Sequence, residues 1–297
     1  MNKNISIIGV PMDLGQTRRG VDMGPSAIRY ADIIARLEHL NMNVEDLGDI
    51  QIERVIEEQT GKLRNLRAVT FATTRLSQVV DSVVEKGHFP LVLGGDHSIA
   101  IGTLAGVSKH YENLGVIWFD AHGDLNPVEK SPTGNIHGMP LAVSLGIGHP
   151  DLTRVGDYSP KVKPENVIII GARDLDPGER DLIKEHSIKV YTMHEIDRLG
   201  MAGVMEDAIH YLKGQTDGVH LSLDLDALDP HDAPGVGTPV LGGITYRESH
   251  LAMEMLAEAE IISSAEFVEV NPILDEKNKT AKVAVALIGS LFGEKLL

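Results

Sequence analysis

The segment Asp120-Ala121-His122-Gly123-Asp124 carries three side chains of types that bind metal ions, and it directly follows an apolar run that ends at Phe119. On an extended chain, side chains at alternate positions point to one side, so Asp120, His122 and Asp124 are expected to converge. The small residues between them allow the backbone to approach a bound ion closely. Because Asp and His are also common in loops after strands, a plain loop is the alternative interpretation of this segment alone.

A second segment, Ser222-Leu223-Asp224-Leu225-Asp226, ends another apolar run and places two carboxylates two positions apart. A carboxylate that emerges from a buried strand needs a partner, because burying an isolated charge is very costly. A turn or helix-capping role is the alternative, and it suits Asp229, which precedes Pro230, better than Asp224.

A third segment, Gly94-Gly95-Asp96-His97-Ser98, also follows an apolar run. Its two glycines allow a sharp turn that would bring His97 inward. A single histidine is more often a packed or capping residue than a ligand. Three such segments in one chain, however, all fall beyond the ends of strands, which is where open α/β sheets bind ligands.

Together the three segments offer six metal ligands: His97, Asp120, His122, Asp124, Asp224 and Asp226. Four carboxylates balance two divalent cations, and paired sites hold their ions roughly 3.5–4 Å apart, so the set predicts a binuclear centre. The chain has no Cys, which leaves oxygen and nitrogen donors that suit Mn²⁺, although Zn²⁺ also accepts them. Two ions that share a water present hydroxide as a nucleophile, which predicts hydrolysis. The residual negative charge favours a cationic substrate such as a guanidinium or an amine.

The elements that position these residues follow from alternating apolar runs and amphipathic stretches, a pattern typical of βαβ units around a parallel sheet. We expect strands at Ile5–Val10, Asn43–Leu47, Pro90–Leu93, Gly115–Phe119, Asn166–Ile170, Lys189–Tyr191, Gly218–Leu223 and Glu266–Val270. We expect a helix that opens at Gly24-Pro25 and others at Leu63–Glu85, Ile99–Tyr111, Met201–Leu212, Glu248–Glu258 and Lys282–Leu291. No linker, charge block or repeat divides the chain, which indicates one domain over residues 1–297. An open doubly wound sheet and an eight-stranded (β/α) barrel both fit this pattern.

The charge balance excludes some classes of protein. The 297 residues include 43 Asp or Glu against 27 Lys or Arg, a formal net charge of −16, which argues against a nucleic-acid binder. No stretch reaches 18 apolar residues, and the N-terminal residues do not read as a signal peptide. We therefore expect a cytoplasmic protein with no nucleic-acid or membrane partner.

The segments GGDHS (94–98), DAHGD (120–124) and SLDLDALDP (222–230) resemble the ureohydrolase family, and the resemblance spans nearly the whole chain. Three further segments, TGNIHGMP (133–140), GARDLDPGE (171–179) and GTPVLGGITYRE (237–248), are more similar to its arginase branch than to its agmatinase branch. The resemblance implies a single α/β domain with an open, doubly wound, eight-stranded parallel sheet and helices on both faces. It also implies two Mn²⁺ per subunit, held by the six residues above.

The activity that the resemblance implies is hydrolysis of L-arginine to L-ornithine and urea by attack of a metal-bridging hydroxide. An agmatinase or another guanidino-acid ureohydrolase is the alternative within the family. A binding protein or sensor for a guanidino ligand is the alternative from another class, and His137 and Glu269 speak against it because binding a metal alone requires neither. The resemblance further implies a homo-oligomer, a trimer or a hexamer.

The resemblance also implies catalytic roles for particular residues. His137 matches a mobile proton-transfer histidine, and Glu269 matches the acid that orients the substrate guanidinium. Asp124 would orient the nucleophile and carry its proton in addition to binding metal. From the sequence alone, His137 is equally well an exposed residue of a glycine-rich loop, and Glu269 equally well a member of a structural ion pair.

Recognition of the amino-acid end of the substrate is expected in the loops. The resemblance assigns the α-carboxylate to Asn126, Thr133 and Asn135, and the α-amino group to Asp176 and Glu179. Thr238, which precedes Pro239, is expected to donate a hydrogen bond close to the metal ligands. Turn chemistry for the two asparagines and a helix start for Asp176 are the alternative interpretations, and neither is incompatible with binding.

Overall fold

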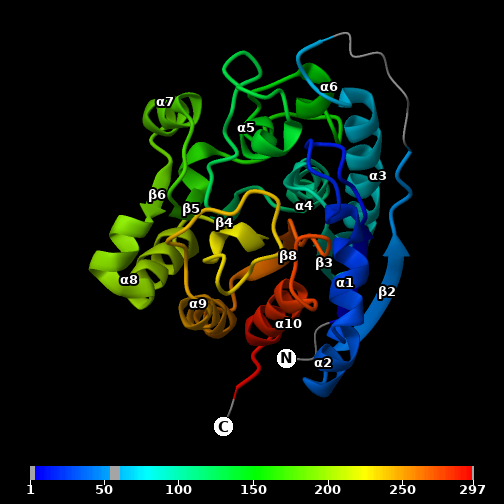
Figure 1. The fold of residues 1–297 in the computed structure, drawn as a ribbon, viewed down its shortest axis with the longest axis vertical. Coiled ribbons are helices and arrows are strands. Elements are labelled where there is room, and N and C mark those ends of the chain that lie inside the picture. Colours follow the sequence, from blue (N-terminus) through cyan, green and yellow to red (C-terminus); the bar gives the residue numbers. More distant parts are fainter. Residues whose placement is uncertain (1–3, 54–60, 296–297) are drawn as a thin grey trace.

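The computed structural model describes residues 4–53 and 61–295. Its centre is one sheet of eight strands: β1 (Asn4–Val10), β2 (Asn43–Asp49), β3 (Phe89–Gly94), β4 (Leu114–Phe119), β5 (Val167–Ala172), β6 (Lys189–Thr192), β7 (Gly218–Asp224) and β8 (Ile262–Val268). All neighbouring strands run parallel, in the order β2-β1-β3-β8-β7-β4-β5-β6. The sheet is open, with β2 and β6 at its edges (Figure 1). The prediction of an open parallel sheet is confirmed, and the barrel is excluded.

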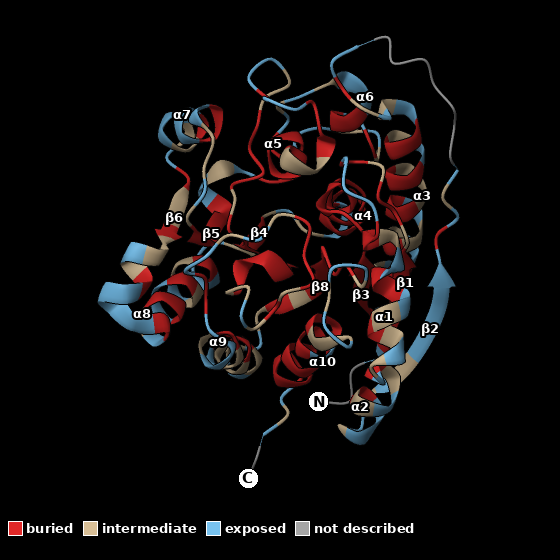
Figure 2. Ribbon diagram, viewed as in Figure 1, coloured by how far each residue is buried: buried red, intermediate tan, exposed pale blue. Residues whose placement is uncertain are grey.

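Helices cover both faces of the sheet, because alternate residues of each buried strand point to opposite sides. One apolar layer packs α1 (Gly24–Tyr30), α2 (Ile33–His39), α8 (Met193–Lys213), α9 (Tyr246–Ala259) and α10 (Lys279–Leu291) against the sheet. The other packs α3 (Leu66–Glu85), α4 (Ala100–Val107), α5 (Pro140–Ser144), α6 (Pro150–Thr153) and α7 (Pro177–His186). Figure 2 shows the central strands and the inner helix faces buried, whereas the edge strand β2 is largely exposed.

Several predicted boundaries were wrong. Strand β8 begins at Ile262 and ends at Val268, so Glu269 follows the strand instead of lying in it, and its backbone φ is 66°. Helix α8 begins at Met193, eight residues before the predicted start, and Gly200 (φ 71°) breaks it internally. Helix α4 ends at Val107 and continues only as a 3₁₀ turn. Helices α2, α5 and α6 were not predicted as separate elements. Helix α7 was anticipated only through the helix start considered for Asp176, which the structure confirms as its N-cap.

The topology brings distant parts of the chain together at one edge of the sheet. Strands β7 and β8, which come last in the sequence, lie between β3 and β4. The carboxyl ends of these four central strands therefore meet at the same edge, and the three predicted ligand segments follow β3, β4 and β7. None of the helices in the described ranges is long and apolar enough to cross a membrane.

Candidate metal centre

The predicted ligands gather into two adjoining groups at the ends of the central strands. The first ligand group consists of His97, Asp120 and Asp224, and the second of Asp120, His122 and Asp226. Within each group the ligand atoms lie within 4.8 Å of one another. Asp120 belongs to both. Its Oδ2 lies 3.1 Å from His97 Nδ1, and its Oδ1 lies 3.2 Å from His122 Nδ1. One carboxylate thus faces two ligand groups with one oxygen each, which is the geometry that two neighbouring ions require.

Asp124 reaches the same place by a turn of the backbone. Its Oδ2 lies 3.0 Å from His97 Nδ1, and its φ is 52°. The expectation that an extended chain would align this residue with Asp120 was wrong, because the segment turns at Asp124 into the left-handed region. A non-glycine residue there costs about 1–3 kcal/mol and persists only when its surroundings hold it. Leu141 and Ala142 do so, because their N–H groups both donate to the Asp124 carbonyl.

Neutral donors hold the orientation of the carboxylates. Trp118 Nε1 donates to Asp120 Oδ2 at 3.0 Å, and Thr238 Oγ1 donates to Asp226 Oδ2 at 2.9 Å. The backbone N–H of Asp226 donates to Asp224 Oδ1 at 2.7 Å. Within the described ranges, no Lys or Arg forms an ion pair with these acids. Neutral hydrogen-bond donors therefore orient these three buried carboxylates.

The donor atoms fit divalent cations. His97 Nδ1 is buried and makes no hydrogen bond among the described residues, although three carboxylate oxygens lie 3.0–3.2 Å away. Burial lowers the pKa of His97, but Asp124 and the other acids outweigh it, so the pKa lies well above its usual value. Burial and the neighbouring Asp226 raise the pKa of Asp224. The cluster thus needs positive charge, and two divalent ions bound by nitrogen and oxygen would supply it.

Glu269 and His137 form a pair beside this cluster. Glu269 Oε1 accepts the N–H of His97 at 2.9 Å and lies 3.4 Å from His137 Nδ1, while Oε2 accepts Gln16 Nε2 at 3.0 Å. Burial lowers the pKa of His137, but Glu269 outweighs it and the pKa rises to about 9. Glu269 has a positive φ, and its carboxylate lies beside His97 and His137. The structure therefore places this acid in an ion pair that is itself part of the candidate site.

A cavity of about 220 Å³ opens over the cluster. The predicted site residues that line it are His122, Asp124, Asn126, Thr133, Asn135, His137, Asp176, Glu179, Asp224, Asp226 and Thr238. The side chains of His97, Asp120 and Glu269 are 1% exposed and lie outside this lining. The amide oxygens Oδ1 of Asn126 and Asn135 are buried and have no hydrogen-bond partner among the described residues. Their unused bonding capacity is suited to a polar ligand.

Asp176 and Glu179 are tied to each other as a capping box at the start of α7. Glu179 Oε2 accepts the N–H of Asp176 at 2.8 Å, and its Oε1 accepts the N–H of Leu125 at 3.1 Å. Burial raises the pKa of Glu179 to about 7. Asp176 Oδ2 accepts Asn126 Nδ2 at 2.9 Å. Glu179 therefore holds two backbone segments of the cavity wall.

Sequence reasoning missed three residues that contact the site. Trp118, the only tryptophan of the chain, stacks on the ring of His97 with a centroid distance of 4.1 Å. Gln16 binds Glu269 from the N-terminal loop, and no local pattern marks it. Arg173 donates to the carbonyl of Asp226 at 2.7 Å and lies inside the segment GARDLDPGE, where its side chain had no assigned role. Asp229, by contrast, takes the predicted turn role, because it accepts the N–H groups of His231, Gly242 and Gly243.

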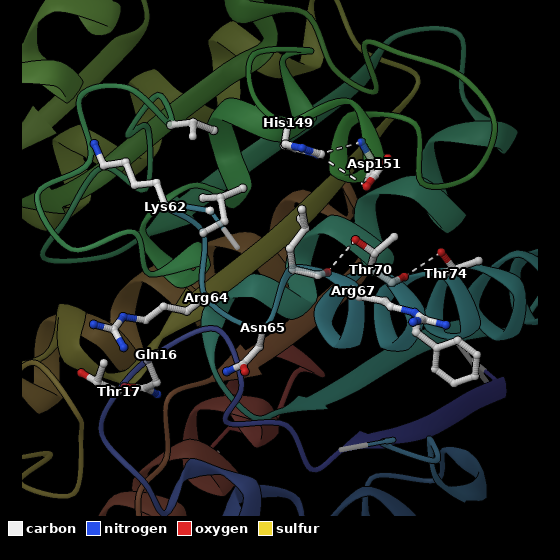
Figure 3. Close-up of a pocket in the computed structure, with 15 residues that line it drawn as sticks. Gln16, Thr17, Lys62, Arg64, Asn65, Arg67, Thr70, Thr74, His149 and Asp151 are labelled. Atoms are coloured by element: carbon white, nitrogen blue, oxygen red, sulfur yellow. Dashed lines mark hydrogen bonds and ion pairs between the residues drawn. The ribbon is translucent and has the colours of Figure 1, made fainter. Parts of the chain in front are cut away.

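A second and larger hollow, about 1220 Å³, lies along the start of α3 (Figure 3). The cationic side chains of Lys62, Arg64 and Arg67 line it, and none of the predicted site residues does. The bonds drawn there join Thr70 and Thr74 to the preceding turn of α3 and His149 to Asp151. The chemistry-bearing cavity is therefore the smaller one.

Fold and cluster together define a class: an α/β protein that carries paired groups of His and Asp side chains suited to two metal ions. A family model described as the arginase family matches residues 3–293, and the chain belongs to this family. It is an enzyme, a hydrolase of the arginase type.

Relatives support this assignment over the full length. The chain is 73% identical to the arginase of Bacillus caldovelox over 99% of this chain and 100% of that protein, and the crystal structure of that arginase superposes with a TM-score of 0.97. It is 69% identical to the arginase of Bacillus subtilis over 100% of both chains. An Entamoeba histolytica arginase solved in complex with L-ornithine is 34% identical, with a TM-score of 0.90 over 98% of this chain and 99% of that one.

Proposed function

We propose that this protein is a manganese-dependent arginase that hydrolyses L-arginine to L-ornithine and urea. The observation that carries the proposal is the carboxylate of Asp120, which faces both ligand groups with one oxygen each. Two Mn²⁺ would be held by His97, Asp120, His122, Asp124, Asp224 and Asp226. When bound, the two ions would lower the pKa of a water molecule between them and so supply hydroxide near neutral pH.

The remaining side chains then handle protons and orientation. Asp124 lines the cavity; it would orient the nucleophile through a hydrogen bond and carry its proton to the leaving nitrogen. His137 also lines the cavity, and its partner Glu269 favours the protonated imidazolium that a proton donor to the departing amine needs. Glu269 lies buried behind this lining, and its negative charge would orient the guanidinium of the substrate, as the family resemblance implies.

The loops above the cluster recognise the other end of the substrate. Asn126, Thr133 and Asn135 line the cavity and would bind the α-carboxylate through the hydrogen-bond donors that they carry, the amide NH₂ groups and the hydroxyl. Asp176 would bind the α-amino group, and Glu179 would act mainly by holding Asp176 in place. A site built from hydrogen-bonding groups rejects an analogue that leaves those groups unpaired.

The decisive experiment measures urea release from L-arginine and from agmatine, which lacks the carboxylate, with the same preparation. We expect turnover of arginine that disappears after chelation and returns with Mn²⁺, together with weak turnover of agmatine. Arginine hydrolysis that survives complete metal removal would refute the metal dependence. A clear preference for agmatine would instead support an agmatinase.

The family resemblance also favours a homo-oligomer, a trimer or a hexamer. From the sequence, we separately propose a cytoplasmic location. Light scattering on the purified protein would distinguish the two assemblies, and a monomer would contradict both. Fractionation of the source cells would test the location.

A further inference from the structure

Four polar side chains form a buried row between the sheet and α4. His220 and Ser222 of β7 lie beside Ser264 and Glu266 of β8, with Ser222 in register with Glu266 and His220 with Ser264. All four residues are 0% exposed. Because side chains alternate along a strand, they share the face on which Val116, Trp118 and Val268 belong to the apolar layer. An apolar layer has no need of these groups, since a buried carboxylate is costly to desolvate.

The row leads directly to the metal cluster. His97 Nε2 lies 2.8 Å from Ser222 Oγ, and Ser222 Oγ donates to Glu266 Oε1 at 2.7 Å. His220 Nε2 lies 3.5 Å from the same Glu266 oxygen, and His220 Nδ1 lies 2.8 Å from Ser264 Oγ. The imidazole of a candidate metal ligand is thus connected through a hydroxyl to a fully buried carboxylate.

The direction of these bonds fixes the proton on the imidazole. A serine hydroxyl has one proton, and Ser222 gives it to Glu266, so its oxygen can only accept from the Nε2–H of His97. In the neutral imidazole that binds a metal, Nδ1 is therefore the nitrogen without a proton, and it faces the oxygens of Asp120, Asp124 and Asp224. A metal-binding histidine needs this arrangement, with one nitrogen bonded to a partner and the other free to coordinate.

We propose that Ser222 and Glu266 are positioning residues that hold His97 in the Nε2–H tautomer and aim its Nδ1 at the first ligand group. The inference rests on the proposed metal centre and adds to it a support that reaches from the cluster into the middle of the sheet. Neither residue lines the cavity, and both act only through His97.

The test compares two matched serine deletions in the metal-free protein. Ser222→Ala and Ser264→Ala each remove one fully buried hydroxyl that lies 2.8 Å from a histidine ring, but only Ser222 contacts a metal ligand. Metal-supporting partners of this kind are typically worth 10–100-fold in affinity. We expect Ser222→Ala to bind one Mn²⁺ 10–100-fold more weakly and the second normally, and Ser264→Ala to bind both within about twofold of wild type.

The readout is Mn²⁺ titration followed by the fluorescence of Trp118, whose ring stacks on His97, with the number of ions counted by elemental analysis. Thermal unfolding of the metal-free variants measures the purely structural cost of each deletion. A structural role alone would lower the melting temperature of both variants without a selective loss of one ion.

Glu266→Gln provides a second route, because an amide accepts from Ser222 more weakly than a carboxylate does. This substitution should also lower the affinity for one Mn²⁺. The variant that combines Glu266→Gln with Ser222→Ala should bind Mn²⁺ no more weakly than Ser222→Ala alone, since Glu266 acts through Ser222. If Ser222→Ala does not fold, the Mn²⁺ affinity of Glu266→Gln is compared with that of Ser264→Ala in the same way. Equal Mn²⁺ affinities in the test and control variants would overturn the inference while the proposed function stands. A wild-type protein that binds no Mn²⁺ would overturn the proposed function itself.

Discussion

Arg173 offers a quantitative test of how the second ligand group is held. Its guanidinium makes six hydrogen bonds to five backbone carbonyls, those of Gly171, Asp226, Ala227, Leu228 and Val240, at 2.7–3.2 Å. These carbonyls belong to the end of β5, to the turn that carries Asp226 and to the segment after Thr238. Thr238 donates a hydrogen bond to the carboxylate of Asp226, so Arg173 holds the backbone on both sides of this contact.

The substitution Arg173→Lys keeps the positive charge but leaves one nitrogen with three donors. It can serve at most three of the five carbonyls, so two lose their partner. Each lost bond costs about 1–1.5 kcal/mol, which gives about 2–3 kcal/mol in total. For a chain of this size, about 2 °C per kcal/mol predicts a melting temperature lower by about 4–6 °C.

The assay is thermal unfolding of the metal-free protein, followed by Mn²⁺ titration. Arg180→Lys is the matched control, because Arg180 is an exposed arginine of α7 that makes one bond, from Nε to the carbonyl of Leu175 at 3.0 Å. The control should change stability by less than about 0.5 kcal/mol. The reasoning is refuted if Arg173→Lys melts within 1 °C (about 0.5 kcal/mol) of wild type, or if the control falls equally far.

Three further outcomes follow from the geometry. Asp120→Asn should weaken the binding of both Mn²⁺ ions, and Asp226→Asn mainly the binding of one, with the bound ions counted by elemental analysis. Equal losses of bound Mn²⁺ in the two variants would contradict a carboxylate shared by both ligand groups. Asn135→Ala should lower kcat/KM for arginine about 10–100-fold, the loss of one hydrogen bond to a charged group, and leave agmatine unaffected, so parallel losses would remove Asn135 from carboxylate binding. Burial raises the pKa of Asp229, but the N–H groups that it accepts outweigh this and lower the pKa to about 2. Its stabilisation is therefore complete above pH 4 and lost as the pH falls towards 2, so Asp229→Asn should melt below wild type at pH 6 and level with it near pH 2; a gap that does not change with pH would contradict this assignment.

The ligand segments could be predicted because their information is local. Each combines an apolar strand with a short run of Asp and His, and the carboxyl ends of parallel strands meet at one edge whatever the strand order. The strand order itself is not local, so the sequence left the open sheet and the barrel unresolved until the family resemblance favoured the open sheet. The role of Gln16 was equally out of reach, because its partner Glu269 lies 253 positions away.

One predicted strand boundary was wrong because the chain stays buried after it has stopped pairing with the sheet. The apolar residue Val270 extends the apolar run beyond the strand and is fully buried, but β8 ends at Val268 and the next residue, Glu269, has a positive φ. At α8 the missed first turns are polar, but Thr192 and Glu195 form a capping box, a signal that is present in the sequence. The same signal, Asp176 with Glu179, marks the start of α7 and explains why Glu179 turns towards the backbone.

The order of the strands ties the metal centre to completion of the fold. His97 follows β3 and Asp120 follows β4, but these strands are not neighbours, because β8 and β7 lie between them. Ser222 on β7 and Glu266 on β8 supply the support of His97 from inside that gap, and Asp224 supplies the acid that faces its Nδ1. The first ligand group therefore cannot exist until the last two strands of the chain have been inserted. A cation that binds only the finished group stabilises the native state against every form in which these strands are unpaired, so metal affinity and fold stability are linked.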